Sequence, residues 1–263
     1  MKRISSRTNP FFKNLLKLAH SSRERRKSNL TLLDGVHLIA AYREHIGAPR
    51  SWIVCDSGAD NSEIKLMLDE ARPLEVFVLA NGLFAEISSV TPDVGIVALI
   101  PTPAPVAPRS DADFCILLDG IQDPGNLGSI LRSAAAAGVS DVMLSKQCAF
   151  AWSPRVLRAG MGAHFMLKLH EHADLLDYVV RYDGKIVATC ARAEQTIFEI
   201  DLKGKLALLI GNEGAGISDA LLRIASQRVT IPMPGKTDSL NAAAAAAVCL
   251  FERVRQTRKQ QSG

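Results

Sequence analysis

The sequence predicts an α/β protein of two domains, the second of which is built on a mostly parallel sheet. Apolar runs of strand length alternate with helical patterns along the chain. A proline-rich segment at residues 101–108 divides the chain. Polar loops rich in glycine follow several of the later apolar runs. With 263 residues, the chain is long enough to bury a core in each of two modest domains.

The composition excludes a disordered, fibrous or membrane-spanning protein. Hydrophobic residues make up 48% and charged residues 22% of the chain, as in ordinary globular proteins. The longest apolar run, Ala242 to Phe251, is far shorter than the roughly 20 residues that a membrane span requires. No apolar signal core follows the basic start of the chain. We therefore expect a cytoplasmic protein with no membrane partner.

The cysteines and histidines predict neither disulfides nor a metal site. The five cysteines are scattered and form no C-x-x-C pair, which favours buried thiols in a reducing compartment. His170 and His172 form the only close histidine pair, and no further ligands with metal-site spacing lie near them.

Basic residues are concentrated at the N-terminus. Residues 1–27 contain nine Lys and Arg against one acid, Glu24, which gives this arm a charge of +8, whereas the rest of the chain carries −4. Such an arm suggests contact with a phosphate backbone, although a solvated helix face has the same composition. Apolar residues such as Phe11 and Leu15 lie among the basic ones, so part of the arm is predicted to form an amphipathic helix.

Residues 1–100 are predicted to form a small α/β domain. Helical patterns cover Val36 to His45 and Ile64 to Glu70, and extended patterns cover Trp52 to Cys55, Glu75 to Leu79 and Gly95 to Ile100. Residues 101–110 then contain four prolines, a composition that tends to polyproline II and acts as a semi-rigid spacer. The sequence therefore predicts a linker there and a second domain over residues 111–263.

The second domain opens with an apolar strand, Phe114 to Leu118, and a polar loop from Asp119 to Gly128. A helix is predicted to begin at the end of that loop and to stop at Gly138. Asn126 stands where an N-cap belongs, and Arg132 follows about two turns later. Asn126 is therefore either a cap or part of a site, and Arg132 is either a surface cation or a phosphate ligand.

The middle of this domain continues the alternation. Strands are predicted from Asp141 to Leu144, from Met166 to Leu169 and from Lys185 to Thr189, with a helix from Ala173 to Tyr182. Small residues between Ser153 and His164 favour close packing.

The last quarter of the chain places two polar loops after two apolar strands. The run from Leu206 to Ile210 leads directly into three glycines between residues 211 and 216. A second short strand leads into the loop from Ile231 to Asn241, which delivers Ser239 and Asn241 into the first turn of a long helix. In an open α/β sheet, ligands bind at the carboxyl ends of strands, so both loops are candidates for a site.

Neither loop is a phosphate-binding motif. The glycines at 211, 214 and 216 do not fit G-x-G-x-x-G, and Thr230 stands where a Walker A loop ending at Lys236 and Thr237 needs glycine. The alternative to a site is that the glycines only punctuate turns and that Glu213 is a solvated acid.

Three stretches together resemble the sequence motifs of the SpoU (TrmH-type) RNA ribose methyltransferases. They are Asp119 to Ala134, Leu209 to Ile217 and Ile231 to Asn241; they occur in the family's order, and the resemblance covers residues 114 to about 255. By its layout, the N-terminal domain with its proline-rich joint resembles the L30e-like substrate-binding domain that many members carry.

The resemblance implies a trefoil-knotted α/β domain, one of the exceptions to the rule against knotted chains, that works as a homodimer. It also implies S-adenosylmethionine as the methyl donor. By motif position, backbone groups of Gly211, Ile231 and Leu240 would contact this cofactor, and Thr189 would line the same pocket.

The implied reaction is attack of a ribose 2′-hydroxyl on the sulfonium methyl group. This hydroxyl is a poor nucleophile at neutral pH, so the site must accept its proton or stabilise the alkoxide as it forms. The family assigns this role to the arginine of the first motif, here Arg132. Because arginine is almost always protonated, we expect it to act as an electrostatic stabiliser and phosphate clamp. The resemblance gives Asn126, Glu213, Ser239 and Asn241 the role of orienting the ribose, Arg132 and the loops.

The six alanines from Ala242 to Ala247 depart from the more varied pattern of the family. Alanine favours helix and permits the close approach of a partner helix. A packing face that includes the dimer contact is predicted at helical spacing, at Leu240, Ala243, Ala244, Ala247, Val248, Phe251 and Val254. The family pattern includes a serine in this stretch. Its absence here affects only hydrogen bonds in the outer part of the site.

The sequence thus predicts an S-adenosylmethionine-dependent RNA 2′-O-methyltransferase. Large-subunit ribosomal RNA is the expected substrate and transfer RNA the alternative. A non-catalytic RNA-binding protein acting in ribosome assembly is a second class, which the five polar motif residues argue against, and a Rossmann-type nucleotide enzyme is a third. The modified nucleotide does not follow from the sequence, because RNA is recognised by shape and single-stranded context.

Overall fold

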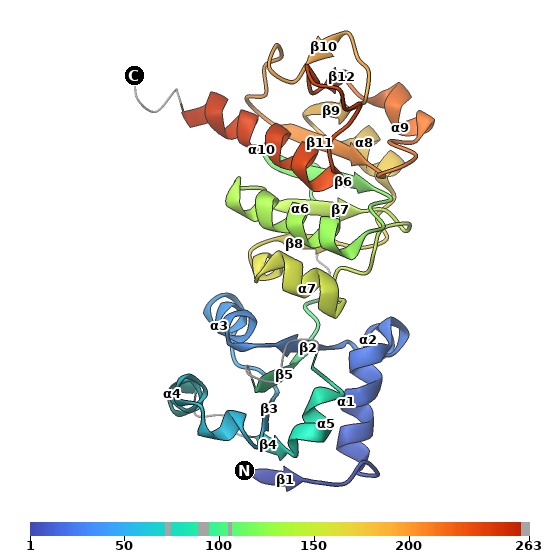
Figure 1. The fold of residues 1–263 in the computed structure, drawn as a ribbon. Coiled ribbons are helices and arrows are strands. Elements are labelled where there is room, and N and C mark those ends of the chain that lie inside the picture. Colours follow the sequence, from blue (N-terminus) through green and yellow to red (C-terminus); the bar gives the residue numbers. More distant parts are fainter. Residues whose placement is uncertain (72–74, 89–94, 105–106, 259–263) are drawn as a thin grey trace. The chain divides into compact units, whose positions relative to one another are not determined.

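The computed structural model describes residues 1–71, 75–88, 95–104 and 107–258, which divide into two compact units (Figure 1). Unit 1 comprises Met1–Ala104 and Trp152–Phe165, and unit 2 comprises Pro105–Ala151 and Met166–Gly263. Each unit carries its own sheet with helices packed against it. The predicted α/β class is confirmed.

Unit 1 contains a five-stranded sheet with the strand order β1-β4-β3-β5-β2. The strands are β1 (Lys2–Ile4), β2 (Leu30–Asp34), β3 (Ser51–Cys55), β4 (Val76–Leu79) and β5 (Ile96–Pro101). β1, β4 and β3 run parallel, whereas β5 is antiparallel to β3 and β2. The helices of residues 1–104 are α1 (Pro10–His20), α2 (Ser22–Ser28), α3 (Val36–His45), α4 (Ser62–Ala71) and α5 (Asn81–Ala85), with a 3₁₀ turn, η1 (Gly58–Asp60).

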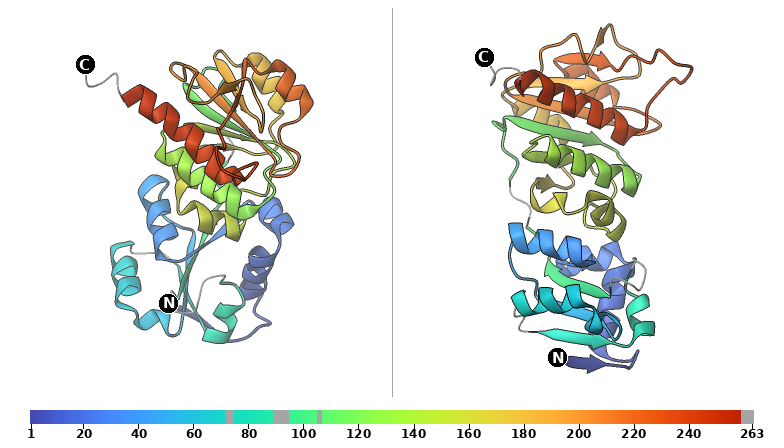
Figure 2. Two further views of the ribbon diagram at one scale, coloured as in Figure 1. Left: turned by 45° about the horizontal axis from the view of Figure 1, so that its top comes forward. Right: turned by 60° about the vertical axis from the view of Figure 1, so that its left-hand side comes forward.

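The amphipathic helix predicted in the basic arm is α1. Asn9 caps its start by accepting hydrogen bonds from the backbone N–H groups of Phe11 and Phe12, at 2.9 and 3.3 Å. Phe12, Leu15 and Leu18 are buried in one core cluster with residues of β3, β4 and α5. Figure 2 shows α1 and α5 on one side of this sheet and α3 and α4 on the other. The exposed face of α1 is left to the polar and basic residues.

The segment Trp152–Phe165 belongs to unit 1, although the sequence placed it in the second domain. It forms α7 (Pro154–Gly160) and a 3₁₀ turn, η3 (Ala163–Phe165). A Cβ atom on Gly162, whose φ is +89°, would lie 2.7 Å from the Cβ of Ala41 in α3. The rings of Tyr42 and Phe165 pack edge to face at 5.3 Å. The small residues of this segment therefore do permit close packing, but against α3.

The predicted linker begins later than its prolines suggested. Pro101 is the last residue of β5 and pairs with Leu30, and the Thr102 amide donates to the Asn29 carbonyl over 2.8 Å. Both residues are therefore part of unit 1. Pro105 and Val106 of the predicted linker lie outside the described residues.

Unit 2 contains a seven-stranded sheet with the order β10-β12-β9-β11-β6-β7-β8, and every neighbouring pair is parallel. The strands are β6 (Phe114–Asp119), β7 (Asp141–Leu144), β8 (Lys168–His170), β9 (Lys185–Thr189), β10 (Gln195–Thr196), β11 (Leu206–Gly211) and β12 (Gln227–Thr230). The helices are α6 (Pro124–Ala136), α8 (Leu175–Arg181), α9 (Asp219–Ile224) and α10 (Ala242–Arg258). The predicted parallel sheet is confirmed.

The two faces of this sheet are covered by different helices. Tyr178 and Val179 of α8 and Leu221 of α9 share a core cluster with alternate strand residues such as Cys115 and Leu209. α6 and α10 pack against each other, and α10 also contacts β11 (Figure 1). Both faces are thereby removed from water, which explains why β6 and β11 are continuous apolar runs.

The buried face of α10 is not the predicted one. Its buried residues are Ala242, Ala246, Cys249, Leu250 and Glu252. Phe251 of the predicted face is 48% exposed, and Leu240, which precedes the helix, is 40% exposed. As a face packed within the chain the prediction was out of phase, because six consecutive alanines carry no hydrophobic periodicity. The dimer contact predicted on that face stays a prediction.

The cysteine side chains are not paired with one another. All five cysteines are free thiols, and Cys55, Cys115 and Cys249 are buried. No helix in the described ranges is long and apolar enough to cross a bilayer. Those same ranges hold no group of three His, Cys, Asp or Glu side chains placed to bind a metal.

Gly162→Ala is expected to lower the free energy of unfolding of unit 1. The positive φ and the close approach to Ala41 each oppose a Cβ atom, and together they cost about 3 kcal/mol. Gly138→Ala is the control, because its φ is +81° but no atom lies within 4 Å of the added Cβ. Urea denaturation of both variants should show the larger loss for Gly162→Ala, and equal losses would contradict the packing of Gly162 on α3.

Candidate functional site

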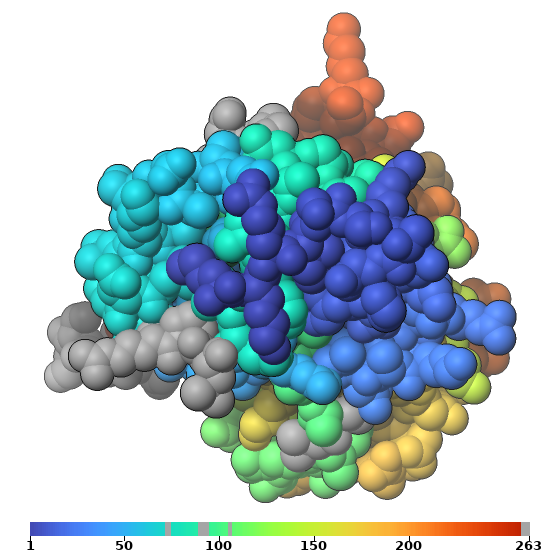
Figure 3. Space-filling model, turned by 90° about the horizontal axis from the view of Figure 1, so that it is seen from below, coloured from blue at the N-terminus to red at the C-terminus, as the bar shows by residue number. Residues whose placement is uncertain are grey.

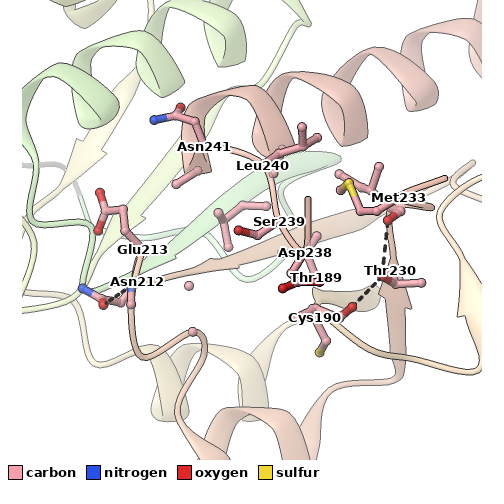
Figure 4. A pocket seen from close by; sticks show the side chains of 18 of the residues that line it. Thr189, Cys190, Asn212, Glu213, Thr230, Met233, Asp238, Ser239, Leu240 and Asn241 are labelled. Carbon is pink, nitrogen blue, oxygen red and sulfur yellow. Dashed lines mark hydrogen bonds between the residues drawn. The ribbon is translucent and has the colours of Figure 1, made fainter. Parts of the chain in front are cut away.

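A cavity of about 710 Å³ lies at the carboxyl edge of the unit 2 sheet (Figure 4). Thr189 ends β9, Gly211 ends β11 and Thr230 ends β12, and all three line it. These strands are neighbours in the order β12-β9-β11, and β6 follows β11. Because parallel strands present their carboxyl ends at one edge, the loops that follow them meet there, as in other α/β ligand sites.

Side chains from three loops are joined by hydrogen bonds at this cavity. Asn126 Nδ2 donates to Glu213 Oε1 over 2.9 Å, and Asn241 Nδ2 donates to Asn126 Oδ1 over 2.8 Å. The backbone N–H of Gln122 reaches the other Glu213 oxygen at 3.5 Å. The three motif loops therefore form one connected polar group.

Asn126 is not the N-cap of α6, contrary to the capping alternative. The cap is Asp123, whose Oδ1 accepts from the Asn126 backbone N–H over 2.7 Å, and Pro124 occupies the first helical turn. The helix therefore begins earlier than predicted. Because Asp123 supplies the cap, the Asn126 side chain is available for Glu213 and Asn241.

Asn241 has two roles. Its Oδ1 accepts from the backbone N–H groups of Ala243 and Ala244, at 2.9 and 3.3 Å, and so caps α10. Its Nδ2 is directed to Asn126. Ser239 also lines the cavity, but it lies in the loop before α10 and not in the first turn of the helix.

All four residues predicted to contact a cofactor line the cavity: Thr189, Gly211, Ile231 and Leu240. A Cβ atom on Gly211 would lie 2.3 Å from the carbonyl carbon of Gly216, so the loop folds back on the end of β11 in a way that only glycine permits. The Thr189 hydroxyl donates to the Leu209 carbonyl over 3.2 Å.

Arg132 is the predicted site residue that does not line the cavity. Its side chain is exposed on α6 and makes no hydrogen bond or ion pair with the part of the chain that the structure describes. It lies six positions after Asn126 on the same helix, which is about 9 Å along the helix axis. The guanidinium is therefore available to a ligand larger than one that fills the cavity.

Several residues of the lining were not predicted, among them Cys190, Asn212, Met233 and Asp238. In Figure 4, Asn212 and Glu213 lie at one end of the cavity and Thr230 and Met233 at the other. Asn212, Met233 and Asp238 lie within the predicted loops, and Cys190 directly follows the end of β9. The position of the strand ends was therefore the signal that could have found them.

The charged side chains of the cavity lining are acidic. The described residues that line it include the carboxylates of Glu213 and Asp238 but no Lys or Arg. Burial raises the pKa of Glu213, but hydrogen bonds from Asn126 and from backbone amides outweigh this effect, and the net pKa is lowered. Apolar side chains such as Ile210, Ile231 and Met233 supply other parts of the wall. Such a lining suits a ligand that is cationic and partly apolar better than a polyphosphate.

Asn126→Ala is expected to raise the pKa of Glu213, because the variant loses a hydrogen bond to the charged carboxylate. In the wild type, the lowered pKa keeps the Glu213 carboxylate charged and hydrogen-bonded at neutral pH, and these bonds are lost as the pH falls through the folded-state pKa. The variant keeps only the backbone donors, so its Glu213 should become protonated at a higher pH than in the wild type. Carbon-13 NMR titration of the carboxyl groups measures this. Glu199, whose pKa is lowered by hydrogen bonds from Thr196, is the internal control. An unchanged Glu213 titration would contradict the account.

Comparison with known proteins identifies relatives along nearly the whole chain. An uncharacterized tRNA/rRNA methyltransferase of Synechocystis is 32% identical over 96% of this chain and 93% of its own length. The 23S rRNA (guanosine(2553)-2′-O)-methyltransferase RlmP of Bacillus subtilis is 31% identical over 95% and 98%. The crystal structure of the SpoU methyltransferase AviRb from Streptomyces viridochromogenes in complex with AdoMet has a TM-score of 0.85 and 30% identity, and covers 95% of this chain and 98% of AviRb.

A family model also matches the sequence of this chain. Residues 113–251 match the model of the SpoU rRNA Methylase family. The match includes all three loops of the cavity and more than half of the chain. This chain therefore belongs to the SpoU rRNA methylase family.

Proposed function

We propose that this protein transfers a methyl group from S-adenosylmethionine to a ribose 2′-hydroxyl of large-subunit ribosomal RNA. The observation that carries the proposal is the hydrogen-bonded group of Asn126, Glu213 and Asn241 beside a cavity at the carboxyl ends of parallel strands. The family, and relatives named 23S rRNA 2′-O-methyltransferases, support the reaction and the RNA class.

The cavity fits the proposed cofactor in charge and size. S-adenosylmethionine brings a sulfonium-bound methyl group, and its sulfonium and ammonium groups are both cationic. The carboxylates of Glu213 and Asp238, with no basic residue in the described lining, favour such a ligand over a phosphate-bearing nucleotide. A cavity of about 710 Å³ is within the usual range for small-molecule sites.

The residues of the chain would act by holding the ribose and stabilising charge. Asn126 joins Glu213 and Asn241 by hydrogen bonds and so fixes the polar wall, and Ser239 lines the cavity. Arg132 would bind a phosphate of the RNA, because it is exposed on the helix that carries Asn126 and lies outside the cavity. A phosphate clamp orients the 2′-hydroxyl and offsets the charge that develops as its proton leaves.

Unit 1 is proposed as the L30e-like substrate-binding domain. Lys13 and Lys17 of α1 and Arg23 and Lys27 of α2 are exposed and have no ion-pair partner among the described residues. Lys2, Arg3 and Arg7 of the same arm are each paired with an acid of unit 1. Figure 3 shows the N-terminal segment, in blue, on the surface of unit 1. The unpaired cations would contact RNA phosphates.

The assembly and location of the protein are further parts of the proposal. A trefoil knot and a homodimer are what family membership implies. The exposed side chains of Phe251 in α10 and of Leu240 just before it support a contact with a second copy there. A cytoplasmic location is part of the same proposal, and the proposed action on ribosomal RNA supports it.

The direct test is transfer of radiolabelled methyl from S-adenosylmethionine to total RNA from a strain that lacks the gene. We expect label in one large RNA species, in a nucleotide linkage that resists alkaline hydrolysis. Arg132→Ala should lower kcat/KM by about 100-fold or more, because it loses a charged hydrogen-bond partner of the transition state. Label in transfer RNA would mean that transfer RNA, and not ribosomal RNA, is the substrate. No label on any RNA would favour the alternative that the protein binds RNA without catalysis.

Lys13→Ala with Lys17→Ala is expected to weaken RNA binding and to reduce its salt dependence. Each phosphate contact contributes about 0.7 to 0.9 to the slope of log K against log salt, so the double variant should lose about 1.4 to 1.8. Filter binding at several salt concentrations measures both quantities. Lys2→Ala with Arg3→Ala is the matched control, since Glu75 and Asp56 already pair with these residues. Equal effects of the two double variants would contradict the proposal that Lys13 and Lys17 of α1 contact RNA phosphates.

A further inference from the structure

Asn212 connects two of the cavity loops through one side chain. Its Oδ1 accepts from the backbone N–H groups of Gly214 and Ala215, both at 2.9 Å, and its Nδ2 donates to the Gly120 carbonyl over 2.6 Å. Its backbone also forms a pair of hydrogen bonds with Gly216, at 2.9 and 3.0 Å. The side chain thus shapes the loop after β11 and fixes it to the loop after β6.

The attachment point at Gly120 is itself held in place. Gly120 is buried, has a φ of +72°, and donates its N–H to Ser145 Oγ over 3.0 Å. A second connection between the same two loops runs from the Ser218 N–H to Asp119 Oδ2 over 3.0 Å. Asn212, the residue directly before Glu213, therefore joins the loop between Gly211 and Gly216 to a fixed point at the edge of the sheet.

We propose that Asn212 is a positioning residue for cofactor binding, an inference that rests on the proposed function. It acts through its neighbours: it sets the backbone of the loop between Gly211 and Gly216 and the place from which Glu213 reaches Asn126. Without the Asn212 amide, the buried Gly120 carbonyl loses its donor, and the loop loses its fixed distance from β6. The same residues still line the cavity, but their positions relative to one another are no longer fixed.

Two substitutions distinguish the role of the Asn212 Oδ1 acceptor from that of its Nδ2 donor. Asn212→Asp keeps an oxygen for the Gly214 and Ala215 amides but has no donor for Gly120, whereas Asn212→Ala loses both. Asn61 is the matched control, because its Oδ1 also accepts from two backbone N–H groups, those of Glu63 and Ile64 at 2.9 and 3.2 Å, in unit 1. Asn61→Asp and Asn61→Ala test the same chemistry away from the cavity.

The first measurement is the Kd for S-adenosylmethionine by calorimetry, with the unfolding temperature of each variant. Asn212→Asp should raise the Kd by about tenfold or more, and both Asn61 variants should leave it unchanged. A purely structural role would lower the unfolding temperature and leave the Kd of the folded protein as in the wild type. That result would overturn the proposal.

The second measurement is amide hydrogen exchange without any ligand. In Asn212→Asp, Gly214 and Ala215 should stay protected while the amides of Gly120 and Ser218 exchange faster; in Asn212→Ala all four should exchange faster. Unchanged exchange at Gly120 and Ser218 would overturn the role of Asn212. If the wild type fails to bind S-adenosylmethionine, the proposed function fails, and the exchange result still decides whether Asn212 holds the two loops together.

Discussion

The parallel alignment of β6, β11, β9 and β12 is the constraint on which the site depends. Parallel strands end at the same edge, so loops that are far apart in the sequence meet there. Asn126 follows β6, Glu213 follows β11 and Asn241 follows β12, and their side chains are within hydrogen-bond distance. The cavity is thus a property of the sheet, and the polar residues at its edge give it chemistry.

Helix ends supply the second level of organisation. Asp123 caps α6 and Asn241 caps α10, and each cap fixes the point at which a polar side chain enters the site. α6 also carries Arg132, so this one rigid helix fixes the distance between the cavity and the proposed phosphate contact. This spacing is what a reaction on a ribose within a chain of phosphates requires, because the cofactor and the backbone of the RNA must be held at once.

Much of the fold could be predicted because strands buried on both faces are continuous apolar runs, as in β6 and β11. The motif loops were found for the same reason, since they follow those runs. The start of α6 was misplaced because Asp123 followed by Pro124 is an equally good helix start, which the presence of Asn126 obscured. The phase of α10 and the grouping of Trp152–Phe165 with unit 1 depend on tertiary contacts, such as that between Gly162 and Ala41, which leave no periodic trace in the sequence.

The measurement that tests this account most directly is an NMR titration of the isotope-labelled protein with S-adenosylmethionine, following every backbone amide. The account predicts saturable shifts at Thr189, Gly211, Ile231 and Leu240, the residues at the strand ends that line the cavity. Shifts confined to the basic arm of unit 1, or none at millimolar ligand, would contradict the assignment of this cavity as the cofactor site.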